Sequence, residues 1–305
     1  MAGRSAEAAD GSIIVAEVRL THPDKLLYPE QGISKRRLAE YYESVGAWIL
    51  PHIAGRPLSL VRCPAGQEKA CFYQKHLGPA APPAIRHVSI REREGPAAYS
   101  LVEDLPGLVA LVQIGVLEIH PWGARAADVE HPDRLIFDLD PDPALPWSRV
   151  VEAAFAVRDD LAALGFQSFP KTTGGKGLHV VAPIAPKHGW EEVKLFARAF
   201  AAAMVDEAPR RYTINPLKKE RVGRIFIDYL RNERGATAIA PYSTRARPEA
   251  PIAAPLAWSE LSAGTKPALT LATIGARLAR GADPWADMNE IEQQITPAAR
   301  KGLGL

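Results

Sequence analysis

The sequence predicts an α/β (α+β) fold of two lobes, in which short strands and longer helices follow one another along the chain. Residues 147–164 repeat apolar side chains at helical spacing and stop at Gly165, and residues 190–207 form a second such segment. Apolar runs at 134–141 and 178–184 have the length and composition of buried strands. With 305 residues, 47% of them hydrophobic, the chain can bury a substantial core.

The first lobe is expected over residues 18–110, after a polar tail at 1–17 that we expect to be disordered. Ser34 is placed to cap a helix over 35–48, where apolar and aromatic residues recur at helical spacing. The segment 79–95 mixes prolines with arginines, which indicates an exposed loop.

The second lobe is expected over residues 111–265, with strands at 111–122 and 224–232 in addition to those above. A C-terminal helical segment over 266–300 should pack back on the body, so that a single domain covers 18–300. We find no internal repeat and no long low-complexity block.

Composition excludes several classes of protein. The formal charge of +2 selects no class of partner. No apolar run approaches the ~20 residues of a membrane span, and the N-terminus lacks the apolar core of a signal peptide. Only Cys63 and Cys71 are present, so we expect no disulfide framework and a reducing, bacterial-type cytoplasm. Together with His76 and His87 they do not match structural zinc spacing.

Two acids end the apolar run at 134–141. Asp138 and Asp140 are two residues apart, so in a strand both project from the same face. Neighbouring carboxylates repel each other and lose hydration there. A divalent cation removes that cost, and Mg²⁺ and Mn²⁺ prefer oxygen ligands of this kind. A turn at the strand end, where Asp-Pro is common, would explain the pair without chemistry.

A third acid, Asp228, lies within another apolar run, and buried strand acids are rare unless they are paired or bind metal. If it converges on the first two, the three carboxylates suit a two-metal site for phosphoryl transfer, in a polymerase or a nuclease. The alternative is an ion pair with Arg231 or Arg224.

Between these acids in sequence lies the segment KTTGGKGLHV. Gly174, Gly175 and Gly177 allow a sharp turn whose N–H groups face an anion. Thr172 or Thr173 can donate a hydroxyl to a phosphate and Lys176 supplies a positive charge, while His179 begins the outgoing strand. The same residues are also compatible with a purely structural hairpin turn.

Other candidate residues are weaker signals taken alone. His120 ends a strand, Arg245 suits a phosphate, and a basic run precedes the Asp228 strand (Lys218, Lys219, Arg221). Toward the N-terminus, cations accompany adjacent aromatic residues, as base stacking and backbone neutralisation require (Lys25, Lys35, Phe72, Tyr73). Solvated basic faces and a wet helix–sheet interface are the alternatives.

Six segments together resemble a known family: THPDKLLYPEQGISK, EIHPWG, LIFDLDP, KTTGGKGLHV, GRIFIDYLRN and STRARP. They are similar to the polymerase domain of bacterial DNA ligase D, a member of the archaeo-eukaryotic primase superfamily. The resemblance covers about residues 18–300 and keeps the family's motif order. It implies a two-lobed fold with an antiparallel catalytic sheet like that of RNA-recognition domains, flanked by helices.

Carried over residue by residue, the resemblance makes Asp138, Asp140 and Asp228 ligands of two divalent ions, Mn²⁺ or Mg²⁺. Positions that hold the incoming nucleotide are His120, Thr173, Lys176, His179 and Arg245. Positions that contact DNA include Lys25 and Lys35, which grip a downstream 5′-phosphate, and Phe72 and Tyr73, which stack near the template. The family often has Ser where this chain has Thr173. The segment 79–95 lies where the family has a mobile loop that helps bring two DNA ends together.

The implied function is addition of NTPs, in preference to dNTPs, to DNA 3′ ends at gaps and double-strand breaks in non-homologous end joining. The implied partners are DNA with a 5′-phosphate, the Ku end-binding protein, and ligase and phosphoesterase domains, in a nucleoid-associated bacterial setting. A ligase motif and a phosphoesterase domain are missing from the 305 residues, so we expect a stand-alone relative or an excised domain. A primase that starts chains de novo and a non-catalytic DNA end-binding module are the rival interpretations.

Overall fold

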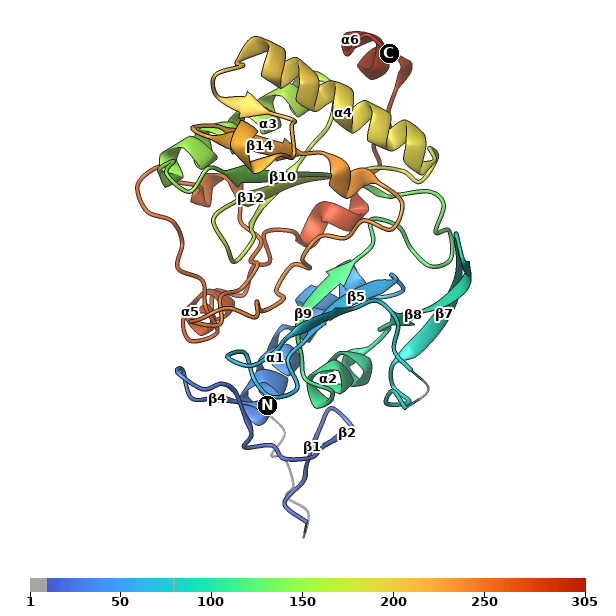
Figure 1. Cartoon of the computed structure of the whole chain (residues 1–305), viewed down its shortest axis with the longest axis vertical. Helices are drawn as coiled ribbons and strands as arrows, with labels where there is room; N and C mark the ends of the chain where they lie inside the picture. The colour runs from blue at the N-terminus through green and yellow to red at the C-terminus, as the bar shows by residue number, and fades with distance from the viewer. Residues whose placement is uncertain (1–9, 79) are drawn as a thin grey trace. The chain divides into compact units, whose positions relative to one another are not determined.

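A computed structural model describes residues 10–78 and 80–305 of the chain (Figure 1). It divides into two compact units, and the chain passes between them several times. The first unit comprises the described residues up to Pro121 together with Ile239–Ala253 and Leu269–Gly281. The second unit comprises Trp122–Ala238, Ala254–Ala268 and Ala282–Leu305.

The first unit is built on helix α1 (Lys35–Ile53) and a five-stranded sheet. Ser34 caps α1 as predicted, because its side chain accepts a hydrogen bond from the backbone of Arg37. The sheet strands are β5 (Leu58–Arg62), β6 (Phe72–Gln74), β7 (Arg86–Glu92), β8 (Gly95–Leu101) and β9 (Val116–Pro121). β9 pairs with β5, so its side chains alternate between the two faces of this sheet.

Two hairpins precede α1, and the first corrects the disordered tail expected over 1–17. Residues 1–9 lie outside the described part of the chain, but β1 (Ile13–Val15) pairs with β2 (Val18–Leu20). Ile13 is fully buried, so burial of an apolar, β-branched side chain outweighs the polar character of its surroundings. The second hairpin joins β3 (Leu26–Tyr28) to β4 (Ile33–Ser34).

Two further predictions in this unit are wrong. Most of the loop expected over 79–95 is a hairpin of β7 and β8, in which a turn at Arg93–Glu94 connects fully registered strands; Pro79 lies outside the described residues. The strand expected from residue 111 begins only at Val116, because helix α2 (Leu105–Gln113) extends through its first part. Gly115, with φ of 79°, lets the chain turn from helix to strand.

Cys63 and Cys71 form a disulfide, contrary to the expectation from sequence. The pairing of β5 with β6 places Arg62 opposite Phe72, so the next residues outward on each strand face each other. Their Cα atoms are 4.3 Å apart, which lies within reach of a disulfide. The pairing of β5 with β6 therefore brings Cys63 and Cys71 together, which the number of cysteines alone did not indicate.

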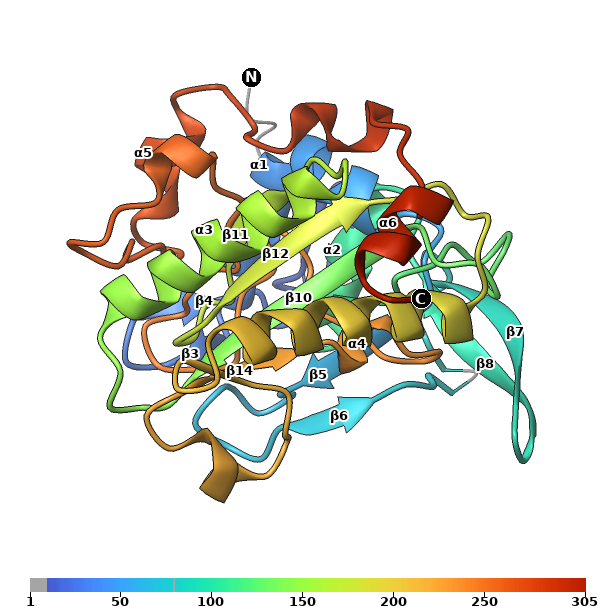
Figure 2. The same cartoon turned by 90° about the horizontal axis from the view of Figure 1, so that it is seen from above.

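The second unit contains a five-stranded sheet in the order β11-β12-β10-β14-β13. The strands are β10 (Arg134–Pro141), β11 (Phe169–Thr172), β12 (Leu178–Pro183), β13 (Tyr212–Thr213) and β14 (Ile225–Asp228). All pairs are antiparallel except β13 with β14. Helices α3 (Trp147–Ala163) and α4 (Trp190–Glu207), both predicted, cover one face (Figure 2), and Phe137 packs on Phe200 there.

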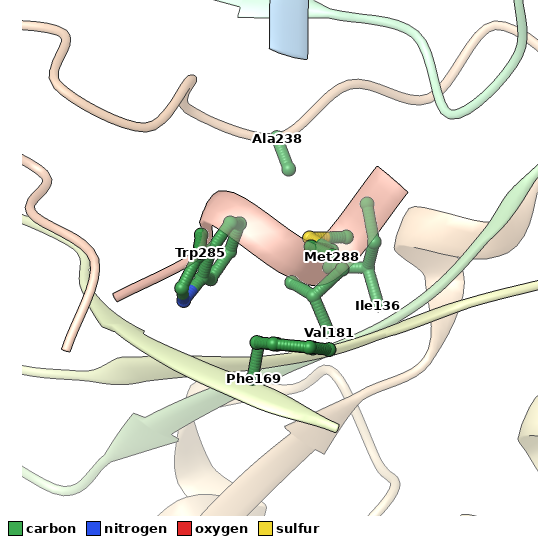
Figure 3. Close-up of a cluster of buried hydrophobic side chains, with 6 residues drawn as sticks. All are labelled: Ile136, Phe169, Val181, Ala238, Trp285 and Met288. Atoms are coloured by element: carbon green, nitrogen blue, oxygen red, sulfur yellow. The ribbon is translucent and has the colours of Figure 1, made fainter. Parts of the chain in front are cut away.

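The opposite face of this sheet carries a small apolar cluster (Figure 3). Side chains from three strands, from the segment around the 3₁₀ helix η4 (Ala286–Glu290) and from the loop that contains Ala238 meet in it: Ile136, Phe169, Val181, Ala238, Trp285 and Met288. Trp285 also donates its ring N–H to the carbonyl of Pro170 at 3.1 Å. The C-terminal part of the chain thus closes one end of the face opposite α3 and α4.

The remaining elements are short. They are the 3₁₀ helices η1 (Lys218–Arg221), η2 (Leu230–Asn232) and η3 (Trp258–Glu260), with α5 (Ile274–Leu278) and α6 (Pro297–Gly302). The stretch 266–300 divides between the units: α5 belongs to the first, while η4 belongs to the second. Across the described residues, every helix falls short of the length and apolarity that a membrane crossing requires.

Candidate active site

A row of charged and polar side chains crosses the sheet of the second unit. Asp138 on β10 lies opposite Asp228 on β14 and opposite His179 on β12, and His179 lies opposite Lys171 on β11. Directly opposed residues project from the same face with Cβ atoms about 5 Å apart. The four residues form a continuous line, here called the Asp138 row. Asp140 projects from the same face two residues further along β10.

Burial and like charge act together on these acids. Burial, and then the charge of Asp138, raises the pKa of Asp140. Burial also raises the pKa of Asp228, although Arg231 opposes the shift. For Asp138 burial acts in the same direction, but His179, Arg231 and Lys171 outweigh it and lower the pKa to about 2. The face therefore holds three carboxylates, and for two of them ionisation is less favourable than in water.

Two arginines supply positive charge to this face. Arg231 Nη2 lies 3.0 Å from a carboxylate oxygen of Asp228 and 3.5 Å from one of Asp138. Arg221, which we expect to contact DNA, places Nη1 2.6 Å from Asp140 and stacks its guanidinium 4.0 Å from the Phe226 ring centre. The ion pair considered as an alternative for Asp228 therefore exists with Arg231.

In the described chain no three side chains of the ligating types form a ready-made metal cage. The carboxylates nevertheless fit divalent cations. They offer only oxygen atoms, they face one another across adjacent strands, and two of them have raised pKa values. Arg231 lies close to both Asp138 and Asp228, so its charge lowers the cost of ionising this pair, but the pKa of Asp228 stays raised.

The glycine-rich turn is fastened to the acid-bearing strand. A Cβ atom on Gly177 would lie 2.2 Å from the carbonyl oxygen of Leu139, so only glycine allows this approach to β10. Within the turn, the Thr173 hydroxyl accepts from the Gly175 N–H and donates to the Gly177 carbonyl. Lys266, which is not part of this turn, donates to the carbonyl of Gly175. Lys176 is exposed on this turn.

His179 follows the glycine-rich turn, belongs to the Asp138 row and is buried. Burial, and then the charge of Lys171, lowers its pKa to about 4 although Asp138 opposes the shift. The imidazole is therefore neutral at physiological pH. Its Nε2 lies 3.4 Å from Asp138, and this nitrogen carries the proton because an ionised carboxylate can only accept.

A second group of predicted residues lies in the first unit, around an acid that the sequence did not single out. Glu118 and His120 project from the same face of β9, and His120 Nε2 lies 2.8 Å from Glu118 Oε2. Arg245 Nε lies 3.0 Å from Glu118 Oε1, as an ion pair rather than a well-aligned hydrogen bond. We call these three residues the Glu118 group. The sequence could have pointed to Glu118 through its position two residues before His120 in the same strand. The contact between Glu118 and Arg245 could not be inferred, because the two residues are far apart in the sequence.

Tyr73 lies beside this group, with its ring edge-on to His120 at a centroid distance of 6.1 Å. Phe72 and Tyr73 are 46% and 51% exposed, and the Arg62 guanidinium lies 5.5 Å from the centre of the Phe72 ring. In the second unit, Lys218 and Lys219 are exposed on η1. These residues retain the surface exposure that contact with a nucleic acid requires.

Lys25 and Lys35 are close enough to interact, but they differ in environment. Burial, and then the charge of Lys25, lowers the pKa of Lys35. The Lys35 ammonium donates to the Thr21 carbonyl at 2.9 Å and to two oxygens of Gln113 at 3.3 Å. Lys25 is exposed. Lys35 therefore also organises the N-terminal segment, a role that the sequence did not indicate.

Comparison with known proteins identifies relatives over nearly the whole chain. Residues 34–285 match the family described as "LigD, primase-polymerase domain". The chain is 40% identical over 304 residues to the multifunctional non-homologous end joining protein LigD of Pseudomonas aeruginosa, covering 99% of this chain and 36% of that protein. It is 34% identical over 281 residues to the protein of the same name in Mycobacterium bovis, covering 90% of this chain and 37% of that protein.

Among solved structures, the polymerase domain of Mycobacterium tuberculosis ligase D in complex with DNA is similar, with a TM-score of 0.84 and 32% identity. The match covers 90% of this chain and 98% of that one. The chain thus spans little more than a third of the curated relatives' length but nearly all of the solved domain. The family resemblance and the fold class inferred from sequence are confirmed.

Proposed function

Because the chain belongs to the LigD primase-polymerase domain family, we propose that it adds nucleotides to DNA 3′ ends at gaps and double-strand breaks during non-homologous end joining. It is a nucleotidyltransferase of the primase-polymerase type. The observation that carries the proposal is the opposition of Asp138 and Asp228 on neighbouring strands, with Asp140 on the same face.

Proteins of this family use divalent metal ions. In our proposal Asp138, Asp140 and Asp228 hold two ions, Mn²⁺ or Mg²⁺. When bound, such ions activate the primer hydroxyl and neutralise charge on the triphosphate. The raised pKa values of Asp140 and Asp228 support this role, because a cation offsets the burial, and then the repulsion by Asp138, that raise them.

The side chains around the acids orient the nucleotide. Neutral His179 stays close to Asp138 without adding a competing positive charge. The turn that carries Thr173 and Lys176 offers a backbone N–H and an ammonium to the triphosphate, beside the acid-bearing strand. In the first unit, His120 and Arg245 also contact the nucleotide in our proposal, and NTPs are preferred to dNTPs.

The remaining predicted residues bind DNA. Lys25 and Lys35 place two like charges near each other, which is costly until an anion such as a 5′-phosphate binds. Exposed Phe72 and Tyr73 stack near the template, and Lys218 and Lys219 contact the backbone. Arg221 is shared between Asp140 and this DNA surface.

The wider partners follow from the relatives, whose printed names describe multifunctional non-homologous end joining proteins. The proposal therefore includes ligase and phosphoesterase domains, in the same chain or separate. It also includes recruitment by the Ku end-binding protein and action at the nucleoid.

The test is primer extension on a gapped duplex with a downstream 5′-phosphate, with Mn²⁺ or Mg²⁺ and either NTPs or dNTPs. We expect growth that favours NTPs and falls at least ~10³-fold, about 4 kcal/mol, in an Asp138→Asn/Asp140→Asn variant. Asp159→Asn, at an exposed position on α3, is the matched control and should extend normally.

The outcomes separate the proposal from its rivals. Retained extension in the double variant contradicts it. DNA binding with no growth in the wild type favours an end-binding module, and shortening of the primer without triphosphate favours a nuclease. Products formed from template and NTPs without a primer would indicate a primase.

A further inference from the structure

In the first unit one buried carboxylate lies between two residues of the proposed nucleotide pocket. Glu118 Oε2 is 2.8 Å from His120 Nε2, and Oε1 is 3.0 Å from Arg245 Nε. The backbone N–H of Ala246 donates to Oε1 at 2.9 Å. Only 8% of the Glu118 side chain is exposed. Every one of these contacts is made within the folded interior of the first unit.

The backbone of Arg245 is held independently of its side chain. Its N–H donates to the carbonyl of Pro251 at 2.9 Å, and its own carbonyl accepts from the Tyr28 hydroxyl at 2.8 Å. The guanidinium is attached through a flexible side chain, so its direction must be set by a separate contact. The ion pair with Glu118 supplies that contact.

Glu118 also determines which nitrogen of His120 carries a proton. Burial alone would raise the pKa of Glu118, but His120, Arg245 and the Ala246 N–H outweigh it and lower the pKa to about 2. The carboxylate is therefore ionised and can only accept hydrogen bonds. His120 must donate from Nε2, and Nδ1 is an acceptor in the neutral ring.

We propose that Glu118 is a positioning residue of the nucleotide pocket, which fixes the Nε2-protonated form of His120 and the direction of the Arg245 guanidinium. This inference rests on the proposed function, because His120 and Arg245 are nucleotide-binding residues only if the chain is a polymerase. Glu118 does not touch the nucleotide itself, and it acts through its two neighbours.

The first experiment uses the full wild-type chain with ¹⁵N-labelled histidine, and His120→Gln assigns the signal. Ring ¹⁵N shifts report which nitrogen is protonated. We expect the Nε2–H form of His120 at neutral pH, and a proton on Nδ1 instead would overturn the proposal. The measurement needs no catalysis, so it remains decisive even if the chain extends no primer.

The second experiment replaces the carboxylate by an amide. In Glu118→Gln the remaining carbonyl oxygen stays with the Ala246 N–H, so the new NH₂ group faces His120 and moves its proton to Nδ1. We expect the ¹⁵N pattern to reverse and the Kd for NTP to rise roughly tenfold. Glu43→Gln, at an exposed position on α1, should change neither.

A double-mutant cycle distinguishes positioning from a general structural role. If Glu118 acts through Arg245, then Arg245→Lys should weaken NTP binding much less in the Glu118→Gln background than in the wild type. Additive effects, or a folded Glu118→Gln variant with wild-type NTP affinity, would overturn the proposal. If the wild type binds no NTP while His120 is Nε2-protonated, the proposed function fails and the geometry stands.

Discussion

The two groups of charged residues balance their charges in opposite ways. In the Glu118 group one carboxylate receives three favourable contacts, and its pKa falls to about 2. In the second unit three carboxylates face Arg221, Arg231 and Lys171, and burial nevertheless raises the pKa values of Asp140 and Asp228. The first group is electrostatically complete within the protein. In the second group two carboxylates remain costly to ionise despite these cations, and a divalent cation would lower that cost.

Lowering the pH should remove the stabilising contribution of Glu118 to the first unit, which is the largest of the three effects predicted below. The folded-state pKa of Glu118 is depressed, so its stabilising contribution is present above the ordinary pKa near 4.5 and disappears as the pH falls toward 2. A shift of this size corresponds to about 3 kcal/mol. Glu118→Gln should therefore be less stable than wild type at pH 6, with a difference that shrinks at pH 3. Urea unfolding at the two pH values measures it, and a constant difference would contradict the assignment.

An added divalent cation should stabilise the folded protein by binding to the three acids of the second unit and not to the Glu118 group. A cation at ten times its Kd raises the free energy of unfolding by about 1.4 kcal/mol if it binds only the folded state. We expect Mn²⁺ to raise the Tm of the wild type and of Glu118→Gln, but not that of Asp138→Asn/Asp228→Asn. Calorimetry gives the Tm shift directly. An equal shift in the double variant would place the ion elsewhere.

The smallest expected effect concerns a surface cation that belongs to neither group. Lys25→Ala should weaken binding of a gapped duplex only a few-fold, under ~1 kcal/mol, because one exposed contact with a phosphate is lost. The loss should occur only when the downstream strand has a 5′-phosphate. Titrations with phosphorylated and unphosphorylated duplexes measure it, with Lys301→Ala at an exposed C-terminal position as the control. Equal weakening on both duplexes would leave Lys25 without phosphate selectivity.

Local sequence patterns were sufficient to predict features that lie within a single helix or strand. Helical spacing predicted α3 and α4 to within a residue, and a polar side chain before an apolar run predicted the Ser34 cap. Strand alternation placed Asp138 and Asp140 on one face. Each of these properties depends on residues a few positions apart, so the sequence contains the whole signal.

Long-range pairing decided the rest. The register that sets Asp138 opposite Asp228, the meeting of Glu118 with Arg245, and the Cys63–Cys71 bond all depend on which strands lie side by side. The same holds for Ile13, whose burial makes an apparent tail part of the fold. The sequence by itself determined which chemical groups are present and which of them share a face of the same helix or strand. Only the tertiary structure decided which charges are balanced, because that depends on neighbours tens of residues away.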